Sequence, residues 1–192
     1  MTFTTTWFDL NRDNWTKWLA RFKDKPGLRF LEIGCFEGRA TVWLLENILT
    51  GNFCYIHVID TFEGNMEHGE DLVKDMEKNF VENVAKKFPS QLFIHKGSSQ
   101  EILRKIGFKK SGIYFDFIYI DGSHQAPDVL EDTILAWRLL KPGGIMVFDD
   151  YKWDKYPDPK LNPKMAIDAF LAIFEGKYEL IAKEYQVCVE KM

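Results

Sequence analysis

The sequence predicts an α/β fold, in which helices cover a doubly wound and mostly parallel sheet of seven strands that ends in an antiparallel hairpin. Short runs rich in Ile, Val, Phe and Tyr alternate with longer stretches of helical period, which is typical of such a sheet. No internal repeat interrupts this alternation. The chain has 192 residues, enough for one sizeable core, so we expect a single domain over residues 1–192.

The first five strands are expected to be buried, because each is a short and nearly continuous apolar run. Two further runs, Tyr178–Ala182 and Gln186–Val189, are separated by only three residues, which favours an antiparallel hairpin at one edge of the sheet. The five buried strands are expected at Leu28–Ile33, Cys54–Ile59, Leu92–His95, Phe115–Ile120 and Ile145–Phe148.

Helices are expected before and between these strands. Residues 1–27 are expected to be an N-terminal helical segment, and residues 28–192 the core of the domain. Within that segment, Asn11–Phe22 has an amphipathic pattern, so this helix either packs on the core or covers a ligand. The sequence Lys141-Pro142-Gly143-Gly144 is expected to end the helix that precedes the fifth strand. The remaining helices are expected at Ala40–Leu49, Leu72–Phe88, Gln100–Ile106, Pro127–Leu140 and Lys164–Phe174.

Charge and composition argue against several classes of protein. The formal net charge is −4 and Lys and Arg form no dense block, which disfavours non-specific binding to nucleic acid phosphates. No apolar run approaches membrane-spanning length, and the first residues lack the pattern of a signal peptide. Cys35, Cys54 and Cys188 have neither metal-ligand spacing nor the density of a disulfide scaffold. We therefore expect a cytoplasmic protein with no nucleic acid and no membrane partner.

The turn after the first strand is the first candidate binding element. In a doubly wound sheet, ligands bind beyond the carboxyl ends of the strands. Here the strand runs into Glu32-Ile33-Gly34-Cys35-Phe36-Glu37-Gly38-Arg39. Gly34 and Gly38 can let the backbone approach a ligand closely, and the helix that follows presents unpaired amides. A purely structural glycine turn is the alternative, since such turns are common in α/β proteins.

Polar residues also follow the second and third strands. Asp60, followed by Thr61 and Phe62, could accept hydrogen bonds from both hydroxyls of a ribose, or could be a capping or turn aspartate. Ser98 and Ser99 could cap the next helix or bond the edge of an adenine.

Three carboxylates are expected to converge after the fourth and fifth strands. Asp121 follows the fourth strand, and Asp149 and Asp150 follow the fifth. Like charges that are brought together need a compensating cation or proton, and oxygen ligands suit Mg²⁺ and Mn²⁺. A set of ion pairs with Lys or Arg, without a metal, is the alternative.

The chain resembles class I S-adenosylmethionine-dependent methyltransferases, which have a Rossmann-like fold. The resemblance rests on features that follow one another in the same order: the acidic glycine turn, the acids after strands two and four, and the Lys-Pro-Gly-Gly sequence. The resemblance spans nearly the whole chain. Within that class, the sequence is similar to the branch that contains metal-dependent macrolide and aminocoumarin sugar O-methyltransferases. It departs from the commonest glycine-rich turn at Phe36, where that turn has a third glycine.

The resemblance implies a role for each candidate residue. Asp121, Asp149 and Asp150 would hold Mg²⁺ or Mn²⁺. His124, three residues after Asp121, would be the general base, and Asp121 would assist in catalysis beside it. Apart from the resemblance, Tyr151, Trp153 and Tyr156 could stack on a sugar ring of the acceptor, because aromatic faces offer apolar area beside polar edges, or they could equally cover the core. The residues implied to bind S-adenosylmethionine are Glu32, Gly34, Phe36, Gly38, Asp60, Thr61, Phe62, Ser98, Ser99 and Asp121.

The expected activity is the transfer of a methyl group to a hydroxyl of a sugar or glycan. The expected partner is a small-molecule or glycan acceptor, recognised by Glu63–Asp71 and Tyr151–Pro163. The sequence is also compatible with a homo-oligomer and with a domain of a larger glycan-modifying protein. The alternatives are a metal-independent small-molecule methyltransferase, a nicotinamide-dependent dehydrogenase and a non-catalytic nucleotide-binding domain. A dehydrogenase would not account for the three acids Asp121, Asp149 and Asp150 at the ends of the fourth and fifth strands.

Overall fold

The computed structural model describes residues 1–64, 69–107 and 114–192. It contains one sheet of seven strands, as the sequence predicts. The strands are β1 (Arg29–Ile33), β2 (Tyr55–Asp60), β3 (Leu92–Lys96), β4 (Phe115–Ile120), β5 (Leu140–Phe148), β6 (Tyr178–Lys183) and β7 (Val187–Lys191).

The sheet has the order β3-β2-β1-β4-β5-β7-β6. The strands from β1 to β5 pair in parallel, whereas β7 runs antiparallel to β5 and to β6. The C-terminal hairpin is therefore confirmed. Because β1, β2, β4 and β5 are parallel, their carboxyl ends lie along one edge of the sheet. The strand order reverses between β1 and β4, and a ligand site is expected at that point of the edge.

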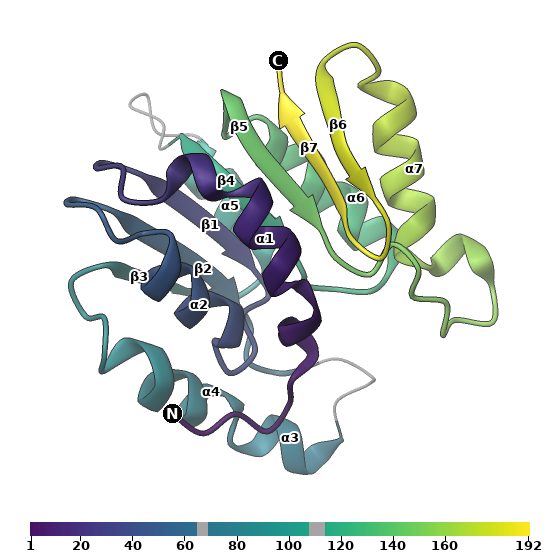
Figure 1. Ribbon diagram of the computed structural model, residues 1–192. Coiled ribbons are helices and arrows are strands. Elements are labelled where there is room, and N and C mark those ends of the chain that lie inside the picture. Colours follow the sequence, from purple (N-terminus) through teal and green to yellow (C-terminus); the bar gives the residue numbers. More distant parts are fainter. Residues whose placement is uncertain (65–68, 108–113) are drawn as a thin grey trace.

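Helices cover both faces of the sheet. The helices α1 and α2 lie on one face, and α5 and α6 lie on the other (Figure 1). The helical elements are η1 (Trp7–Asn11), α1 (Arg12–Trp18), η2 (Ala20–Phe22), α2 (Arg39–Asn47), α3 (Glu70–Lys74), α4 (Met76–Phe80), η3 (Val81–Ala85), α5 (Ser99–Gly107), α6 (Ala126–Trp137), η4 (Pro159–Leu161) and α7 (Pro163–Ile173).

Alternating side chains of the strands form two apolar cores. Phe30 and Phe117 pack with Trp15 of α1 on one face of the sheet. Their neighbours along the strands, Leu31 and Ile118, pack on the opposite face with residues of α5, α6 and α7. This alternation follows from the period of two in a β-strand, and burial on both faces explains why the central strands β1, β4 and β5 are largely apolar.

Four elements differ from the sequence prediction. Strand β3 was expected to be buried, but it lies at the edge of the sheet, and Phe93 is 47% exposed there. The helix expected over Asn11–Phe22 is divided into α1 and the 3-10 helix η2. The single helix expected over Leu72–Phe88 is divided into α3, α4 and the π-helical turn η3. This turn carries Asn83 inward, where its side-chain amide bonds the backbone of Thr2 and the carbonyl of Glu37. Likewise, β5 begins at Leu140, so Lys141-Pro142-Gly143-Gly144 forms the irregular first part of the strand, beside a register shift in its pairing with β4.

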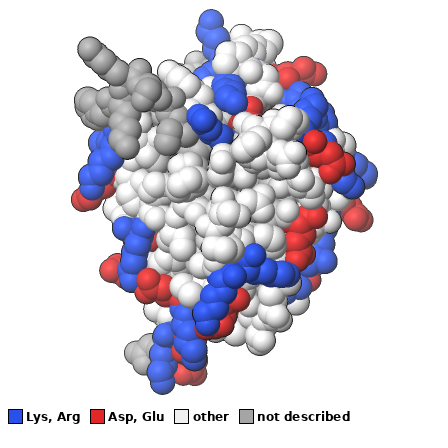
Figure 2. All heavy atoms as spheres, turned by 90° about the vertical axis from the view of Figure 1, so that its left-hand side faces the viewer, with Lys and Arg blue, Asp and Glu red and all other residues white. Residues whose placement is uncertain are grey.

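The edge strand β3 lies on the left in Figure 1, and Figure 2 shows the molecule from that side. Positive and negative side chains alternate around the margin of this face, and a broad area in its middle carries neither. No helix of the described part of the chain is long and apolar enough to cross a membrane.

Candidate functional site

A cavity of about 1020 Å³ opens at the carboxyl ends of β1, β2, β4 and β5. Residues of the N-terminal segment, among them Trp7, Phe8 and Leu10, form part of its wall. The segment is held over the β1 turn by the ion pair between Asp9 and Arg39, whose closest atoms are 2.5 Å apart. Most residues that the sequence predicts for the site line this cavity: Glu32, Gly34, Phe36, Asp60, Thr61, Ser98, Ser99, Asp121, His124, Asp149, Asp150 and Trp153.

Gly34 brings the ends of β1 and β4 together. Its φ is +82°, and a Cβ built on it would lie 2.0 Å from the carbonyl oxygen of Asp121. A side chain at this position would therefore force the two strand ends apart. Glycine is required here so that Asp121 can lie against the turn after β1.

Asp60 fixes the shape of that turn. Its Oδ2 accepts hydrogen bonds from the backbone N–H groups of Cys35 (2.7 Å) and Phe36 (3.0 Å), and its Oδ1 accepts one from Phe62 (2.8 Å). The bonds hold Phe36 at a φ of +48°, which places its ring in the cavity wall beside Trp7, with 5.5 Å between the ring centroids. A carboxylate has about four acceptor positions, so Asp60 retains capacity for a ligand hydroxyl.

Glu32 is a buried carboxyl group in the wall of the cavity. It is 1% exposed, and its Oε2 accepts a hydrogen bond of 2.6 Å from the hydroxyl of Thr41. Burial raises the pKa of Glu32 to about 8. A cationic group of a ligand would favour the ionised form of this side chain.

The two serines after β3 lie at the start of α5. Ser98 immediately precedes the helix and donates a hydrogen bond of 2.7 Å to Oε1 of Gln100, while Ser99 is the first helical residue. Both line the cavity.

Three predicted residues lie outside the lining of this cavity. A Cβ on Gly38 would lie 2.2 Å from Val84, so this glycine permits close packing of η3 rather than approach of a ligand. The ring of Phe62 packs on Phe80. The hydroxyl of Tyr151 donates to Asp168 of α7 and accepts a hydrogen bond from a lysine, so it does not point toward an acceptor. Part of the predicted acceptor stretch Glu63–Asp71, residues 65–68, lies outside the described residues.

Tyr119 lies between two of the predicted carboxylates. Its hydroxyl contacts Oδ2 of Asp121 at 2.9 Å and also contacts Oδ2 of Asp149. A hydroxyl has one hydrogen, so it can donate to only one of them at a time. The second contact requires a proton on a carboxyl group, or else a cation near the pair.

The pKa shifts of these groups have the same cause. Burial, followed by the charges of Asp149 and Asp150, raises the pKa of Asp121 well above its usual range. Burial and the charge of Asp150 also raise the pKa of Asp149. The carboxylates are therefore costly to ionise together unless a positive charge compensates for them.

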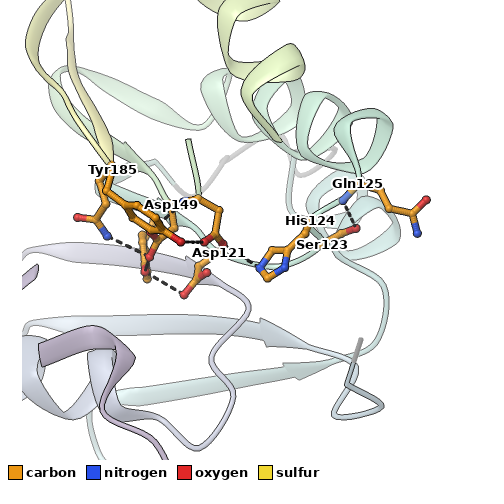
Figure 3. A network of polar contacts seen from close by, with 9 residues as sticks. Asp121, Ser123, His124, Gln125, Asp149 and Tyr185 are labelled. Carbon is orange, nitrogen blue, oxygen red and sulfur yellow. Dashed lines mark hydrogen bonds and ion pairs between the residues drawn. The ribbon is translucent and has the colours of Figure 1, made fainter. Parts of the chain in front are cut away.

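Asp121, His124 and Asp150 form a group that could hold such a charge. Each offers one ligand atom, and these atoms lie within 4.8 Å of one another. Nε2 of His124 lies 2.8 Å from Oδ2 of Asp150. Figure 3 shows the ring of His124 pointing toward the carboxylates at the ends of the strands, near Asp121 and Asp149. Two carboxylates and an imidazole fit a divalent cation, and the nitrogen favours Mn²⁺ over Mg²⁺ if His124 binds it directly.

Asp149 has a different environment from the other two carboxylates. Its Oδ2 accepts a hydrogen bond of 3.0 Å from Nε2 of Gln186, besides the contact with Tyr119. Its Oδ1 accepts one of 2.8 Å from the backbone N–H of Asp150. Asp149 therefore lies beside the group of possible ligands, and direct binding of a metal by Asp149 stays a prediction.

His124 lies in the wall of the cavity beside aromatic residues of the segment after β5. Its ring lies 4.9 Å from that of Trp153, which in turn contacts Tyr156 at 5.0 Å between centroids. The imidazole is 15% exposed in its side chain, so it is partly accessible from the cavity.

Three contributors to the site were not predicted from the sequence. Tyr119 occurs within a predicted apolar strand, and Gln186 at the start of a predicted hairpin strand. Trp15, whose ring contacts Tyr119, lies in the helix that was expected either to pack on the core or to cover a ligand, and no contact with the site was predicted for it. No local sequence signal separates these residues from ordinary core residues, because their roles depend on contacts between distant segments.

The chain matches the family described as methyltransferase domain over residues 31–151. A curated protein of Acanthamoeba polyphaga mimivirus, uncharacterized protein R132, is 28% identical over 173 residues, which cover 83% of this chain and 67% of that protein.

Two solved structures share the fold at low sequence identity. The O-methyltransferase TomG from Streptomyces achromogenes, in complex with S-adenosylmethionine, has a TM-score of 0.67 and 18% identity over 94% of this chain and 79% of its own. The methyltransferase MycE of the mycinamycin pathway, in complex with Mg, S-adenosylhomocysteine and mycinamycin VI, has a TM-score of 0.63 and 16% identity. That match covers 99% of this chain and 50% of MycE.

Proposed function

Since this chain belongs to the methyltransferase domain family, we propose that it methylates a hydroxyl group of a sugar or glycan with the help of Mg²⁺ or Mn²⁺. The chain is a class I S-adenosylmethionine-dependent methyltransferase, in which the sulfonium of the cofactor supplies an activated methyl group. One observation carries the proposal: the carboxylates of Asp121 and Asp150 converge beside the imidazole of His124, with their ligand atoms within 4.8 Å of one another, on the wall of the cavity that also contains the β1 turn.

The cofactor is proposed to lie against the β1 turn. There the buried carboxyl group of Glu32 would face the amino group of the methionine part, and the remaining acceptor capacity of Asp60 would serve the ribose. Gly34 keeps the turn close to Asp121. The cofactor would therefore lie beside the proposed metal ligands.

His124 is proposed to take the proton from the attacking hydroxyl at its Nε2. A bound divalent cation lowers the pKa of a hydroxyl group, as it does for water, so that a neutral imidazole suffices as a base near neutral pH. In the structure Nε2 faces Asp150. If Asp150 were engaged by a cation, Nε2 could accept the hydroxyl proton provided that the single ring hydrogen of the neutral imidazole lies on Nδ1.

The cavity favours an uncharged acceptor. Among the described lining residues Arg39 is the one Arg or Lys, and its guanidinium is bound to Asp9. An acceptor with phosphate groups would meet repulsion from the carboxylates of the lining, which are Glu32, Asp60, Glu63, Asp121, Asp128, Asp149, Asp150 and Glu184.

Apolar and aromatic groups in the lining of the cavity suit the faces of a sugar ring. Trp153 and Tyr156 belong to this lining, as does Leu10 of the N-terminal segment, which is 89% exposed. Aromatic faces provide apolar contact next to polar edges, as sugar rings require.

Two measurements test the proposal. Calorimetry with S-adenosylhomocysteine should give binding, whereas NAD should give none; binding of NAD instead would support a dehydrogenase. Methyl transfer to a panel of neutral sugar acceptors should be lost in EDTA and restored by Mn²⁺ or Mg²⁺. Activity that survives EDTA and is not raised by either cation would contradict the metal part, and transfer only to phosphorylated acceptors would contradict the acceptor part.

A further inference from the structure

We propose that Gln186 is a positioning residue of the metal site and that Trp15 of the N-terminal helix acts through it. The inference rests on the proposed function, because it assigns these residues to the support of the proposed metal ligands. It joins three segments that are far apart in the sequence: α1, the ends of β4 and β5, and the β6–β7 hairpin.

The side-chain amide of Gln186 is held in one orientation. Gln186 is 2% exposed. Its Oε1 accepts a hydrogen bond of 2.8 Å from Nε1 of Trp15, and its Nε2 donates one of 3.0 Å to Oδ2 of Asp149. An indole nitrogen can only donate. A flipped amide would therefore set donor against donor at Trp15 and acceptor against acceptor at Asp149, so Trp15 fixes which end faces the carboxylate.

Trp15 is itself held rigidly. It is fully buried, and its ring packs edge-on against those of Phe8, Phe117 and Tyr119, at centroid distances of 4.9, 5.4 and 4.7 Å. The hydroxyl of Tyr119 contacts the same Oδ2 of Asp149 that accepts from Gln186. One indole thus supports both side chains that meet this oxygen.

Hydrogen bonds connect Asp149 with the group of possible metal ligands. With Oδ2 held, Oδ1 of Asp149 accepts from the backbone N–H of Asp150, at 2.8 Å. Asp150 has a φ of +58°, a conformation that non-glycine residues rarely adopt. The adjacent hairpin residue Tyr185 donates a hydrogen bond of 3.0 Å to Oδ1 of Asp150 (Figure 3). Residues 185 and 186 therefore hold the two neighbouring aspartates in place.

A purely structural role is the competing explanation, since buried polar groups need hydrogen-bond partners in any fold. The two roles differ in what a substitution changes. Loss of a structural contact lowers stability alone. Loss of a positioning contact lowers the affinity for the metal, typically by 10- to 100-fold for residues behind the ligands.

The test is calorimetric titration of Mn²⁺ into the full chain saturated with S-adenosylhomocysteine, for wild type, Trp15→Phe, Gln186→Met and the double variant. Trp15→Phe keeps an aromatic ring but removes the indole donor, and Gln186→Met keeps the length of the side chain without its amide. Trp18→Phe, in the same helix, is the matched control. Thermal unfolding and affinity for S-adenosylhomocysteine establish that each variant is folded. If only one single variant folds, its Mn²⁺ affinity still tests whether the substituted residue supports the metal site.

We expect Mn²⁺ affinity to fall about tenfold in each single variant, to fall no further in the double variant than in Gln186→Met, and to be unchanged in Trp18→Phe. Folded variants with the affinity of wild type would overturn the inference and leave the proposed function intact. Losses that add in the double variant would overturn the claim that Trp15 acts through Gln186. Wild type that binds S-adenosylhomocysteine but no Mn²⁺ would overturn the metal part of the proposed function and this inference with it.

Discussion

Nε2 of His124 and Oδ2 of Asp150 lie 2.8 Å apart, so the proposed base contacts a proposed metal ligand directly. The contact connects α6, which begins just after His124, with the end of β5. The carboxylate orients the imidazole in the cavity wall. With Asp150 on a cation, Nε2 would be free to face the acceptor hydroxyl. The proposed mechanism therefore depends on the separation of this pair when the site is loaded.

His124→Ala is expected to lower kcat by ~10²–10⁴-fold, because general-base catalysis contributes about that much. Affinity for S-adenosylhomocysteine should be unchanged, since the β1 turn is not altered. Single-turnover methyl transfer and calorimetry measure the two quantities. An unchanged kcat would remove His124 from the proposed mechanism.

Asp150→Asn is expected to weaken Mn²⁺ binding by more than tenfold and to abolish the stimulation of turnover by the metal. The exposed Glu175, in the turn after α7, is the control, and Glu175→Gln should behave as wild type. Mn²⁺ titration followed by electron paramagnetic resonance measures the free ion directly. Equal affinity of Asp150→Asn and wild type would place the cation elsewhere.

The metal-free protein is expected to lose stability through Glu32 as the pH rises from about 4.5 to about 8. The pKa of Glu32 is raised to about 8 from the ordinary 4.5 by burial, so the folded state keeps a proton that the unfolded chain has lost over this range. Since the folded state binds more protons, stability falls with rising pH.

The difference in unfolding free energy between wild type and Glu32→Gln isolates this contribution, because other groups that titrate over the range are common to both. Urea unfolding in EDTA at several pH values gives that difference. Wild type should lose stability relative to Glu32→Gln between pH 5 and pH 8. A difference that does not vary with pH would contradict the environment assigned to Glu32.

Gly34→Ala is expected to destabilise the protein much more than Gly143→Ala does. Both glycines have positive φ, of +82° and +74°, but a Cβ on Gly143 meets no atom within 4 Å, whereas one on Gly34 meets the Asp121 carbonyl. The left-handed backbone conformation alone costs a non-glycine residue about 1–2 kcal/mol of folding free energy. Urea unfolding of the two variants should therefore show a cost near that value for Gly143→Ala and a larger one for Gly34→Ala; equal costs would mean that the approach of β1 and β4 is not as close as described.

Trp153 and Tyr151 are expected to respond differently to substitution. Trp153→Leu should raise the KM for the acceptor about 5- to 10-fold, which corresponds to ~1 kcal/mol for an aromatic face. Tyr151→Phe should leave this KM unchanged and lower stability by ~1 kcal/mol, because its hydroxyl bonds Asp168. Steady-state kinetics and thermal unfolding separate the two effects. A higher KM in Tyr151→Phe would restore the acceptor contact that the sequence predicts.

The sequence predicted the parts of the fold that depend on local pattern. Apolar runs located every strand, and the hairpin followed from the short separation of the last two. The prediction of one continuous helix over Leu72–Phe88 was wrong. The π-helical turn carries Asn83 inward, where it bonds Thr2 and Glu37, which are distant in sequence. Periodicity carries no information about such contacts.

The same limit applies to the site. The position after each strand identified Asp60, Asp121 and Asp150, because topology alone brings the strand ends together. Which of the acids lie closest to one another depends on side-chain directions, and these are set by neighbours such as Gln186. Gly38 was assigned to the cofactor from its place in the glycine turn and Tyr151 to the acceptor from its aromatic ring, whereas in the structure Gly38 packs closely on Val84 and the hydroxyl of Tyr151 bonds Asp168.

A divalent cation bound between Asp121 and Asp150 next to the cofactor would appear in an anomalous difference map from crystals grown with Mn²⁺ and S-adenosylhomocysteine. We expect a peak within bonding distance of carboxylate oxygens of both residues, on the wall shared with the β1 turn. Bound S-adenosylhomocysteine with no such peak, or with a peak remote from these two carboxylates, would contradict it.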